Sequence, residues 1–329
     1  MSENLRKACD ALRQGKIVLL LDAMDRENEG DLIVAAEHIT EKSMNFLIQH
    51  GSGIVCLSLS QSKIVSLGLP MMAPENTNLY QTAFTVSIEA RHGITSGVSA
   101  KDRAHTVRVA MADAAHMHDL AIPGHVFPLA AKDGGVFDRL GHTEGSIDLM
   151  KMANLKPGAV LCELMNDDGS MTTGDARIRF AQQYSLPIIS IEELLLHRLA
   201  HENIFIKKTN VIMTQFGQLM WHNFVFLQQI SIDIFTRPTT HHAEETWRVA
   251  VVDGLNVKNR FIRTVLSPDH DDAFIDAILR LANNKLDAVF LTSHEGAKAP
   301  YTSSIFLRGV LTRCRRELGM QNYPEMTMT

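Results

Sequence analysis

The sequence is poor in cysteine, has no long hydrophobic run and carries no strong net charge. Its four cysteines are scattered over 329 residues without the spacing of a zinc ribbon or a CxxC motif, a pattern that suits a reducing cytoplasm. No stretch approaches the roughly 20 apolar residues that a membrane span requires. A formal net charge of −5 offers no basic surface for nucleic acid. We therefore expect a cytoplasmic protein with no membrane or nucleic-acid partner.

Predicted helices and strands alternate along the chain, which indicates layered α/β packing. The chain begins with an amphipathic helix over residues 2–14 rather than a signal peptide. Further helices are expected over 41–49, 99–120, 143–153, 175–183 and 192–202, with strands over 17–21, 54–59, 84–88, 126–129, 159–164 and 188–191. The predicted fold class is α/β (α+β), with a layered mixed sheet flanked by helices.

A second, smaller α/β domain is expected after a polar linker, Lys207 to Asn210. Its predicted elements are strands over 248–252 and 288–292 and helices over 271–283 and 303–318. We place the two domains at residues 1–205 and 206–329.

The densest concentration of charge lies between Asp22 and Asp31, where five of ten residues are carboxylic acids. Crowded carboxylates raise one another's pKa unless a cation holds them ionised. The segment follows the apolar run 17–21, so it falls where a strand opens into a loop, a common place for function. In an extended backbone Glu27, Glu29 and Asp31 would point to one side. They would form an oxygen face suited to a hard divalent cation.

Three interpretations of this acidic segment compete: a solvated acidic loop, a calcium-binding loop, and a metal and acid–base site. The calcium loop fails because its twelfth position, which should be a glutamate, is Ala36, and because a strand rather than a helix precedes it. The choice between the other two depends on residues elsewhere in the chain.

Reactive residues recur in five other segments with turn-like sequences. These segments are Gly51–Cys56, Thr95–Arg103, Pro123–Leu129, Arg139–Glu144 and Cys162–Leu164. In the first, two glycines around a serine allow the backbone to approach a ligand closely. The second offers hydroxyls and amides at a helix N-terminus, where phosphate binds favourably. Taken singly, each is more often a turn, a helix cap or a structural residue, and only their joint presence favours a functional site.

Together these segments resemble a known family. From about Leu5 to Glu202 the chain is similar to 3,4-dihydroxy-2-butanone 4-phosphate synthase of riboflavin biosynthesis, with the motifs in the family's order and approximate spacing. The matching motifs are Asp-Arg-Glu-Asn-Glu-Gly-Asp (25–31), His-Gly-Ser-Gly-Ile-Val-Cys (50–56), Gly-Val-Ser-Ala-Lys-Asp-Arg (97–103), Pro-Gly-His-Val-Phe-Pro-Leu (123–129), Arg-Leu-Gly-His-Thr-Glu (139–144) and Leu-Cys-Glu-Leu (161–164).

The resemblance implies conversion of D-ribulose 5-phosphate to 3,4-dihydroxy-2-butanone 4-phosphate and formate, with a magnesium or manganese ion as the only cofactor. Glu27 and His142 would hold the metal. A mixed set of oxygen and imidazole ligands tolerates either ion. The catalytic residues would be His125, Glu163 and Glu29, since repeated proton transfers call for several acid–base groups. The sequence does not divide the proton transfers among them.

The resemblance also implies how the sugar phosphate is bound. The expected substrate-binding residues are Arg26, Glu27, Asp31, Arg139, Leu140, Gly141, His142, Thr143 and Glu163. Within this set Arg139 and Thr143 would hold the phosphate, whereas Arg26 and Asp31 would hold the sugar. In the family the active site draws on two subunits, so a homodimer is implied.

The opening motif departs from the family pattern. Asp-Asp-Glu-Asp usually precedes its Arg-Glu, and here the corresponding residues are Asp22, Ala23, Met24 and Asp25. Loss of two acids would weaken the enzyme if they only shape a loop, and could inactivate it if one of them transfers protons. The alternative to an active synthase is a weak or inactive regulatory or scaffold protein derived from the bifunctional riboflavin enzyme.

Residues 206–329 resemble at most a degenerate GTP cyclohydrolase II domain, which is often fused to the synthase. The zinc site of that enzyme needs three closely spaced cysteines, and Cys314 is the only cysteine after Cys162. One thiol cannot form a three-thiolate site. We expect no cyclohydrolase activity, and instead a role in oligomer contacts, stability or regulation.

Overall fold

The protein divides into two compact units, residues 1–197 and residues 198–329. The structure is a computed structural model, and it describes residues 1–23, 26–214, 217–226, 230–236, 249–253, 288–293 and 304–318. None of the described helices is long and apolar enough to cross a membrane.

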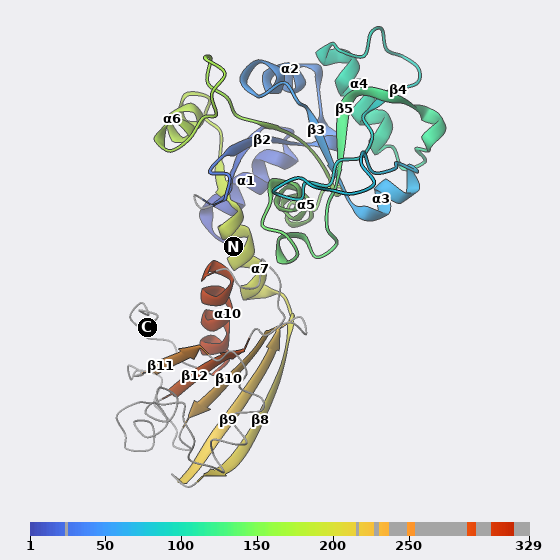
Figure 1. Cartoon of the computed structure of the whole chain (residues 1–329). Helices are drawn as coiled ribbons and strands as arrows, with labels where there is room; N and C mark the ends of the chain where they lie inside the picture. The colour runs from blue at the N-terminus through green and yellow to red at the C-terminus, as the bar shows by residue number, and fades with distance from the viewer. Residues whose placement is uncertain are drawn as a thin grey trace. The chain divides into compact units, whose positions relative to one another are not determined.

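The first unit is built on a mixed seven-stranded sheet (Figure 1). Its strands are β1 (Val18–Leu21), β2 (Gly30–Ala35), β3 (Cys56–Leu59), β4 (Ile88–Ala90), β5 (Leu120–Ala130), β6 (Gly158–Glu163) and β7 (Ile188–Ser190), in the order β4-β5-β3-β6-β2-β1-β7. The pairs β1–β7 and β3–β5 are parallel, and the other neighbours are antiparallel. The predicted mixed sheet is confirmed.

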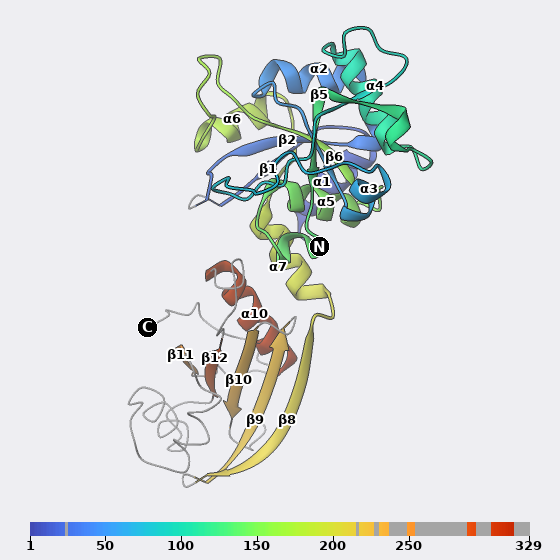
Figure 2. The same cartoon turned by 45° about the vertical axis from the view of Figure 1, so that its right-hand side comes forward.

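Helices cover both faces of this sheet. They are α1 (Glu3–Arg13), α2 (Glu41–His50), α3 (Gln61–Ser66), α4 (Ala100–Met111), α5 (His142–Met152), α6 (Asp175–Gln183) and α7 (Ile191–His201), with short 3-10 turns η1 (Ala36–His38), η2 (Met117–Asp119) and η3 (Gly135–Phe137). Helices α1 and α5 pack on one face, whereas α2 and α4 pack together on the other (Figures 1 and 2). The layered α/β prediction is therefore confirmed.

Local signals in the sequence explain where these helices begin. The Ser2 hydroxyl accepts a hydrogen bond from the Leu5 amide at the start of α1, and Thr40 and Ser43 form a reciprocal capping box at the start of α2. The apolar positions of α1 recur every three or four residues and are buried.

The core lies between the sheet and its helices. Leu19 of β1 and Leu32 of β2 are completely buried, in one cluster with Met44 and Leu47 of α2. Their strand neighbours Leu20 and Ile33 are equally buried on the opposite face. Because both faces of the sheet are covered, the central strands read as continuous apolar runs.

Two predicted elements of the first unit are wrong in extent. The helix expected over 99–120 ends at Met111, because the chain turns and residues from Leu120 onward enter β5 and pair with β4. Tertiary pairing outweighs the helix propensity of this alanine-rich segment. The strand expected over 84–88 is also misplaced, since only Ile88 belongs to β4 and residues 84 and 85 form isolated bridges.

The second unit contains a five-stranded sheet. Its strands are β8 (Phe205–Thr214), β9 (Gly217–Phe226), β10 (Ile230–Thr236), β11 (Val249–Asp253) and β12 (Ala288–Ser293), in the order β11-β12-β10-β9-β8, and helix α10 spans Ser304–Glu317. The Arg313 guanidinium of α10 lies 5.1 Å from the centre of the Phe205 ring. Lys207 to Asn210 lie inside β8, so the predicted linker is wrong. The helix expected over 271–283 lies outside the described residues.

We expect Leu19→Ala to lower the free energy of unfolding by about 2–5 kcal/mol, because it removes a fully buried side chain from a covered strand. Urea unfolding should be followed by far-UV circular dichroism rather than by tryptophan fluorescence. Both tryptophans, Trp221 and Trp247, belong to the second unit, so their fluorescence would not report on the first. Val65→Ala is the control, because Val65 is 69% exposed. Equal effects of the two substitutions would contradict this assignment of the core.

Candidate active site

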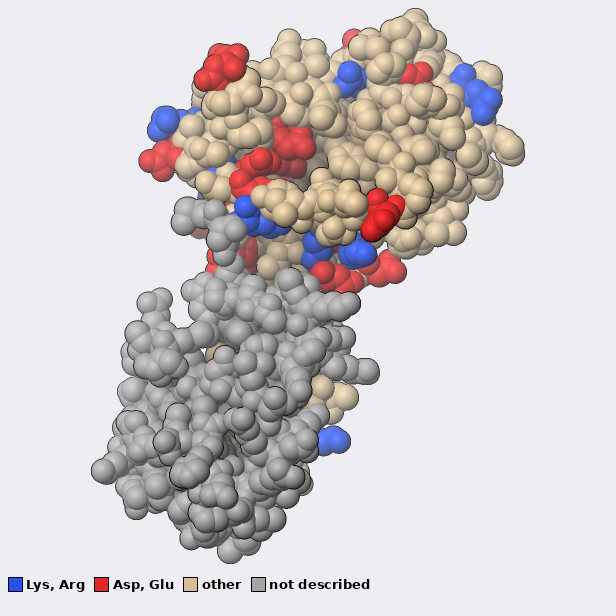
Figure 3. All heavy atoms as spheres, in the orientation of Figure 1, with Lys and Arg blue, Asp and Glu red and all other residues tan. Residues whose placement is uncertain are grey.

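A polar cavity of ≈ 250 Å³ opens where β2, β3 and β6 of the first unit meet their adjoining loops. It is lined by Arg26, Glu27, Glu29, Asp31, Cys56, Asn78, Tyr80, Thr82, Phe84, Leu129, Arg139, His142, Thr143, Leu161 and Glu163. Acidic side chains gather beside a hollow in this unit, with basic ones close by (Figure 3). The antiparallel register pairs Asp31 of β2 with Glu163 of β6, so the sheet itself sets two of the acids side by side.

The acidic segment is a folded loop that joins β1 to β2. The buried Asp22 carboxylate anchors it, because Oδ1 accepts the Glu29 amide (2.8 Å) and Oδ2 accepts the Glu27 amide (3.1 Å) and Arg26 Nη1 (3.0 Å). Asn28 adopts a left-handed backbone, with φ of 57°. The backbone is therefore not extended through Glu27 and Glu29, so the alternation of side chains along a strand does not apply there. The turn nevertheless brings both side chains, with that of Asp31, to the cavity.

A second anchor reaches the loop from α6. Arg177 is buried, and it donates hydrogen bonds to the Glu29 carbonyl (3.0 Å) and to Asn28 Oδ1 (3.1 Å). Ala23 is described, whereas Met24 and Asp25 lie outside the described residues.

Glu27 and His142 offer donor atoms that fit a divalent cation. Together with Asp22 they place one ligand atom each within 4.8 Å of one another. Both oxygens of Asp22 already accept loop hydrogen bonds, so Glu27 and His142 are the better donors. The buried Nε2 of His142 and the buried Oδ1 of Asp31 have no hydrogen-bond partner. Orphaned buried polar atoms are uncommon, and a cation is one way to satisfy them.

Burial and neighbouring charges shift the pKa values of the carboxyl groups in the cavity. Burial, reinforced by Glu163, raises the pKa of Asp31 to about 8, although His142 opposes this. Burial also raises the pKa of Glu29, with the charge of Glu27 adding to the effect. Burial would raise the pKa of Glu27 too, but His142 and Arg26 outweigh it and lower that pKa.

The His142 imidazole lies among these carboxylates. Its Nδ1 lies 3.6 Å from Asp31 Oδ1 and 3.7 Å from Glu27 Oε2. Burial alone would lower the pKa of the imidazole, but Asp31, Glu27 and Asp22 outweigh burial and raise it. The cavity thus combines carboxylates of different proton affinity with an imidazole, as proton transfer near neutral pH requires.

Arg139 and Thr143 lie on another wall of the cavity. Arg139 donates to Glu144 Oε2 (2.7 Å), to the Tyr80 carbonyl (3.0 Å) and to Thr82 Oγ1 (2.9 Å). A side chain at Gly141 would collide with the Arg139 guanidinium. Gly141, at the N-cap of α5, and the half-buried Leu140 do not line the cavity.

His125 does not reach this cavity within one chain. It lies on β5, and its Nδ1 contacts Glu89 Oε1 of β4. Strand β4 is at the edge of the sheet, and β3 lies between β5 and β6. Leu129 is the residue of β5 that lines the cavity.

The phosphate site suggested by Thr95–Arg103 is not formed, because Asp102 already occupies it. Its Oδ2 accepts the Thr95 amide (3.1 Å), the Thr95 hydroxyl (2.7 Å) and the Gly97 amide (3.1 Å). These donors hold the pKa of Asp102 below its usual value. The segment is a capped loop rather than an anion cradle.

None of the sequence motifs includes the segment from Asn78 to Phe84, which supplies four lining residues. The Tyr80 ring lies 5.2 Å from the Arg26 guanidinium, and Thr82 and the Tyr80 carbonyl hold Arg139. Asn78, with Pro74 and Asn76 shortly before it, is typical only of an irregular loop. No periodic pattern marked it as part of a site.

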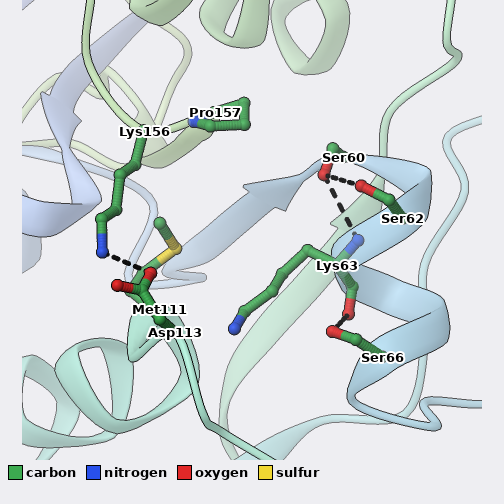
Figure 4. A pocket seen from close by; sticks show the side chains of 8 residues that line it. All are labelled: Ser60, Ser62, Lys63, Ser66, Met111, Asp113, Lys156 and Pro157. Carbon is green, nitrogen blue, oxygen red and sulfur yellow. Dashed lines mark hydrogen bonds and ion pairs between the residues drawn. The ribbon is translucent and has the colours of Figure 1, made fainter.

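A second cavity, of ≈ 370 Å³, lies at the opposite ends of β3 and β6 (Figure 4). It is lined by Ser60, Ser62, Lys63, Ser66, Met111, Asp113, Lys156 and Pro157. Lys156 pairs with Asp113 (2.5 Å), and Lys63 donates to the Ala112 carbonyl (2.7 Å). Its lysines are already engaged, and it has no histidine, so the acidic cavity is the better candidate for catalysis.

The layered fold and the acidic, histidine-containing cavity are those of an enzyme of acid–base chemistry whose side chains fit a divalent cation. The family model of 3,4-dihydroxy-2-butanone 4-phosphate synthase matches residues 6–197. The chain belongs to this family.

Relatives and solved structures agree with this assignment. The 3,4-dihydroxy-2-butanone 4-phosphate synthase of Pectobacterium carotovorum is 55% identical over 201 residues, which are 61% of this chain and 93% of that protein. That of Klebsiella pneumoniae is 54% identical over 200 residues, or 61% and 92% of the two chains.

Two solved structures extend the likeness. A two-domain 3,4-dihydroxy-2-butanone 4-phosphate synthase from A. baumannii matches 99% of this chain and 94% of its own, with 28% identity and a TM-score of 0.75. A synthase in complex with two magnesium ions matches 59% of this chain and 95% of its own, with 38% identity and a TM-score of 0.57. The two-domain relative supports the predicted fusion of a synthase with a second domain.

We expect stability of the metal-free protein to fall as pH rises from about 4 towards 8, because folded Asp31 retains a proton that the unfolded chain releases. Asp31→Asn should flatten this dependence, with a gain on the order of a few kcal/mol near pH 8. The measurement is urea unfolding in EDTA across this range. An unchanged slope in Asp31→Asn would contradict the assignment.

Proposed function

We propose that this protein is a 3,4-dihydroxy-2-butanone 4-phosphate synthase, which converts D-ribulose 5-phosphate to 3,4-dihydroxy-2-butanone 4-phosphate and formate in riboflavin biosynthesis. One observation carries the proposal. Three segments that match the family's motifs, Arg26–Asp31, Arg139–Thr143 and the end of β6 at Glu163, line one cavity although up to 137 positions separate them.

Glu27 and His142 hold a magnesium or manganese ion in this proposal. The ion stabilises negative charge on substrate oxygens when it is bound. The lowered pKa of Glu27 keeps its carboxylate ionised for this task. The unpartnered Nε2 of His142 supports its role as the second ligand.

Glu29 and Glu163 are the proposed acid–base groups of this cavity. The raised pKa of Glu29 brings it closer to neutral pH, where a group both accepts and returns protons efficiently. Glu163 faces the same space from β6. Two carboxyl groups in one cavity allow successive proton transfers to and from a small sugar.

Arg139 and Thr143 are proposed to bind the phosphate. Thr143 is in the first turn of α5, where free amides and the helix dipole favour an anion. In this proposal the Arg139 guanidinium gives up part of its hydrogen bonding to Glu144 and binds the substrate phosphate instead. Arg26 and Asp31, on the other side of the cavity, are proposed to bind the sugar hydroxyls.

We propose that the active unit is a homodimer in which His125 completes the partner's cavity. Its separation from the cavity of its own chain supports this. Arg103 donates to the carbonyls of Gly53 and Val98, which gathers the half-exposed Ile54 and Val98 on one surface. An apolar surface of this kind suits contact between copies of the chain.

We further propose a cytoplasmic location and a synthase domain that ends near residue 205. The remainder, 206–329, is proposed to be a degenerate GTP cyclohydrolase II-like domain without cyclohydrolase activity. Cys314, the single cysteine of that part, is buried, so it supports no thiolate zinc site.

The purified full-length protein should release formate from ribulose 5-phosphate in a magnesium-dependent manner, in equal amount to the four-carbon product. EDTA should abolish this release, and Glu27→Gln should lower it by about 100-fold or more, because a metal ligand is lost. The exposed Glu41→Gln is the matched control. No formate above background, under conditions where an authentic synthase turns over, would refute the proposal.

A mixing experiment tests the shared site. His125→Ala and Glu163→Gln should each be nearly inactive, but random mixed dimers should recover about one quarter of wild-type activity, because half of the dimers then carry one intact site. The two variants should be co-expressed and assayed for formate. Absence of recovery in co-purified mixed dimers would place the whole site within one chain.

A further inference from the structure

Ser52 contacts the carboxylate of Glu163, the proposed acid–base group on β6. Its hydroxyl donates a hydrogen bond of 2.6 Å to Glu163 Oε2, at the short end of the range for O–H···O bonds. Ser52 itself does not line the cavity. No other hydrogen bond reaches the Glu163 carboxylate among the described residues.

The direction of this hydrogen bond follows from counting protons. The Ser52 oxygen accepts the Ile54 amide (3.2 Å) and lies 3.6 Å from Cys162 Sγ. A hydroxyl has one proton and two acceptor sites. Because the Ser52 hydroxyl donates its single proton to Glu163 Oε2, the Cys162 thiol donates to Ser52. Both neighbours therefore orient the hydroxyl towards the carboxylate.

The backbone around Ser52 is tied to the same strand end. The Ser52 amide donates to the Glu163 carbonyl (2.9 Å), and Gly51 forms a bridge with Leu164. A side chain at Gly51 would collide with Cys162 Sγ, and Gly53 has φ of 83°. The Gly-Ser-Gly sequence thus permits the close approach that places this hydroxyl under Glu163.

We propose that Ser52 is a positioning residue for the synthase reaction, which holds Glu163 Oε2 and thereby leaves Oε1 to face the substrate. Such a fixed carboxylate needs no reorientation before it exchanges a proton. Ser52 touches Glu163 and not the cavity, so its loss alters the chemical step more than substrate binding. This inference rests on the proposed function of the cavity.

The test compares Ser52→Ala, Ser52→Cys and Ser52→Thr in the full-length protein. We expect kcat for formate release to fall about 10- to 100-fold in Ser52→Ala, with KM for ribulose 5-phosphate changed less than about twofold. Threonine keeps a hydroxyl and should restore most of kcat, and cysteine, a weaker donor, should lie between. Ser66→Ala, at the distant second cavity, should match wild type.

A double-mutant cycle shows whether Ser52 acts through Glu163. In a Glu163→Gln background, Ser52→Ala should change the residual kcat less than about twofold, because the group that Ser52 positions is already gone. Additive losses, a threonine variant as poor as alanine, or a rise in KM at unchanged kcat would overturn the proposal. If the wild-type protein releases formate and Ser52→Ala has the same kcat, the proposal for Ser52 is overturned while the proposed function stands.

Discussion

The antiparallel register of β2 with β6 is the constraint on which this site depends. It sets Asp31 opposite Glu163, and the β1–β2 turn then holds the acidic loop beside them. Two buried strands with both faces covered by helices cannot slip by one residue without turning their apolar side chains outward. Packing of the core therefore fixes the strand register, and the register fixes the positions of Asp31 and Glu163 relative to each other.

The cost of this arrangement is a concentration of negative charge in a partly buried space, and the chain offsets it locally. Arg26 contacts Asp22 and Glu27 within the loop, and the buried His142, whose pKa is raised, lies beside Glu27. Asp31 is left without a hydrogen bond to Oδ1, and burial raises its pKa to about 8. A site with such an unsatisfied buried carboxyl group favours the binding of a cation or of a substrate rich in hydroxyls.

Sequence patterns predicted the scaffold well where local signals and packing agree. The helix at Glu41–His50 and strand β1 are examples, since a capping box marks the helix and an apolar run marks the strand. Strand β2, which is equally covered, was not predicted. Sequence patterns failed where strand pairing outweighed helix propensity, as in the helix that ends at Met111. They also failed where polar residues occupy a strand, as at Lys207 to Asn210. Such residues look like a linker until their partners in β9 are known.

The site was predictable only in part, for a related reason. Glu27, His142 and Glu163 belong to motifs, but Tyr80 holds Arg139 through a backbone carbonyl, which any residue could offer. Asp22 shows the same logic inside the acidic loop: it organises residues 26–29 through amides, while Arg177 secures them from α6. These two anchors are intact, so the described turn stands without the acids that the family usually carries at positions 23 and 24. The departure in the motif thus leaves in place the loop geometry that presents Glu27 and Glu29 to the cavity.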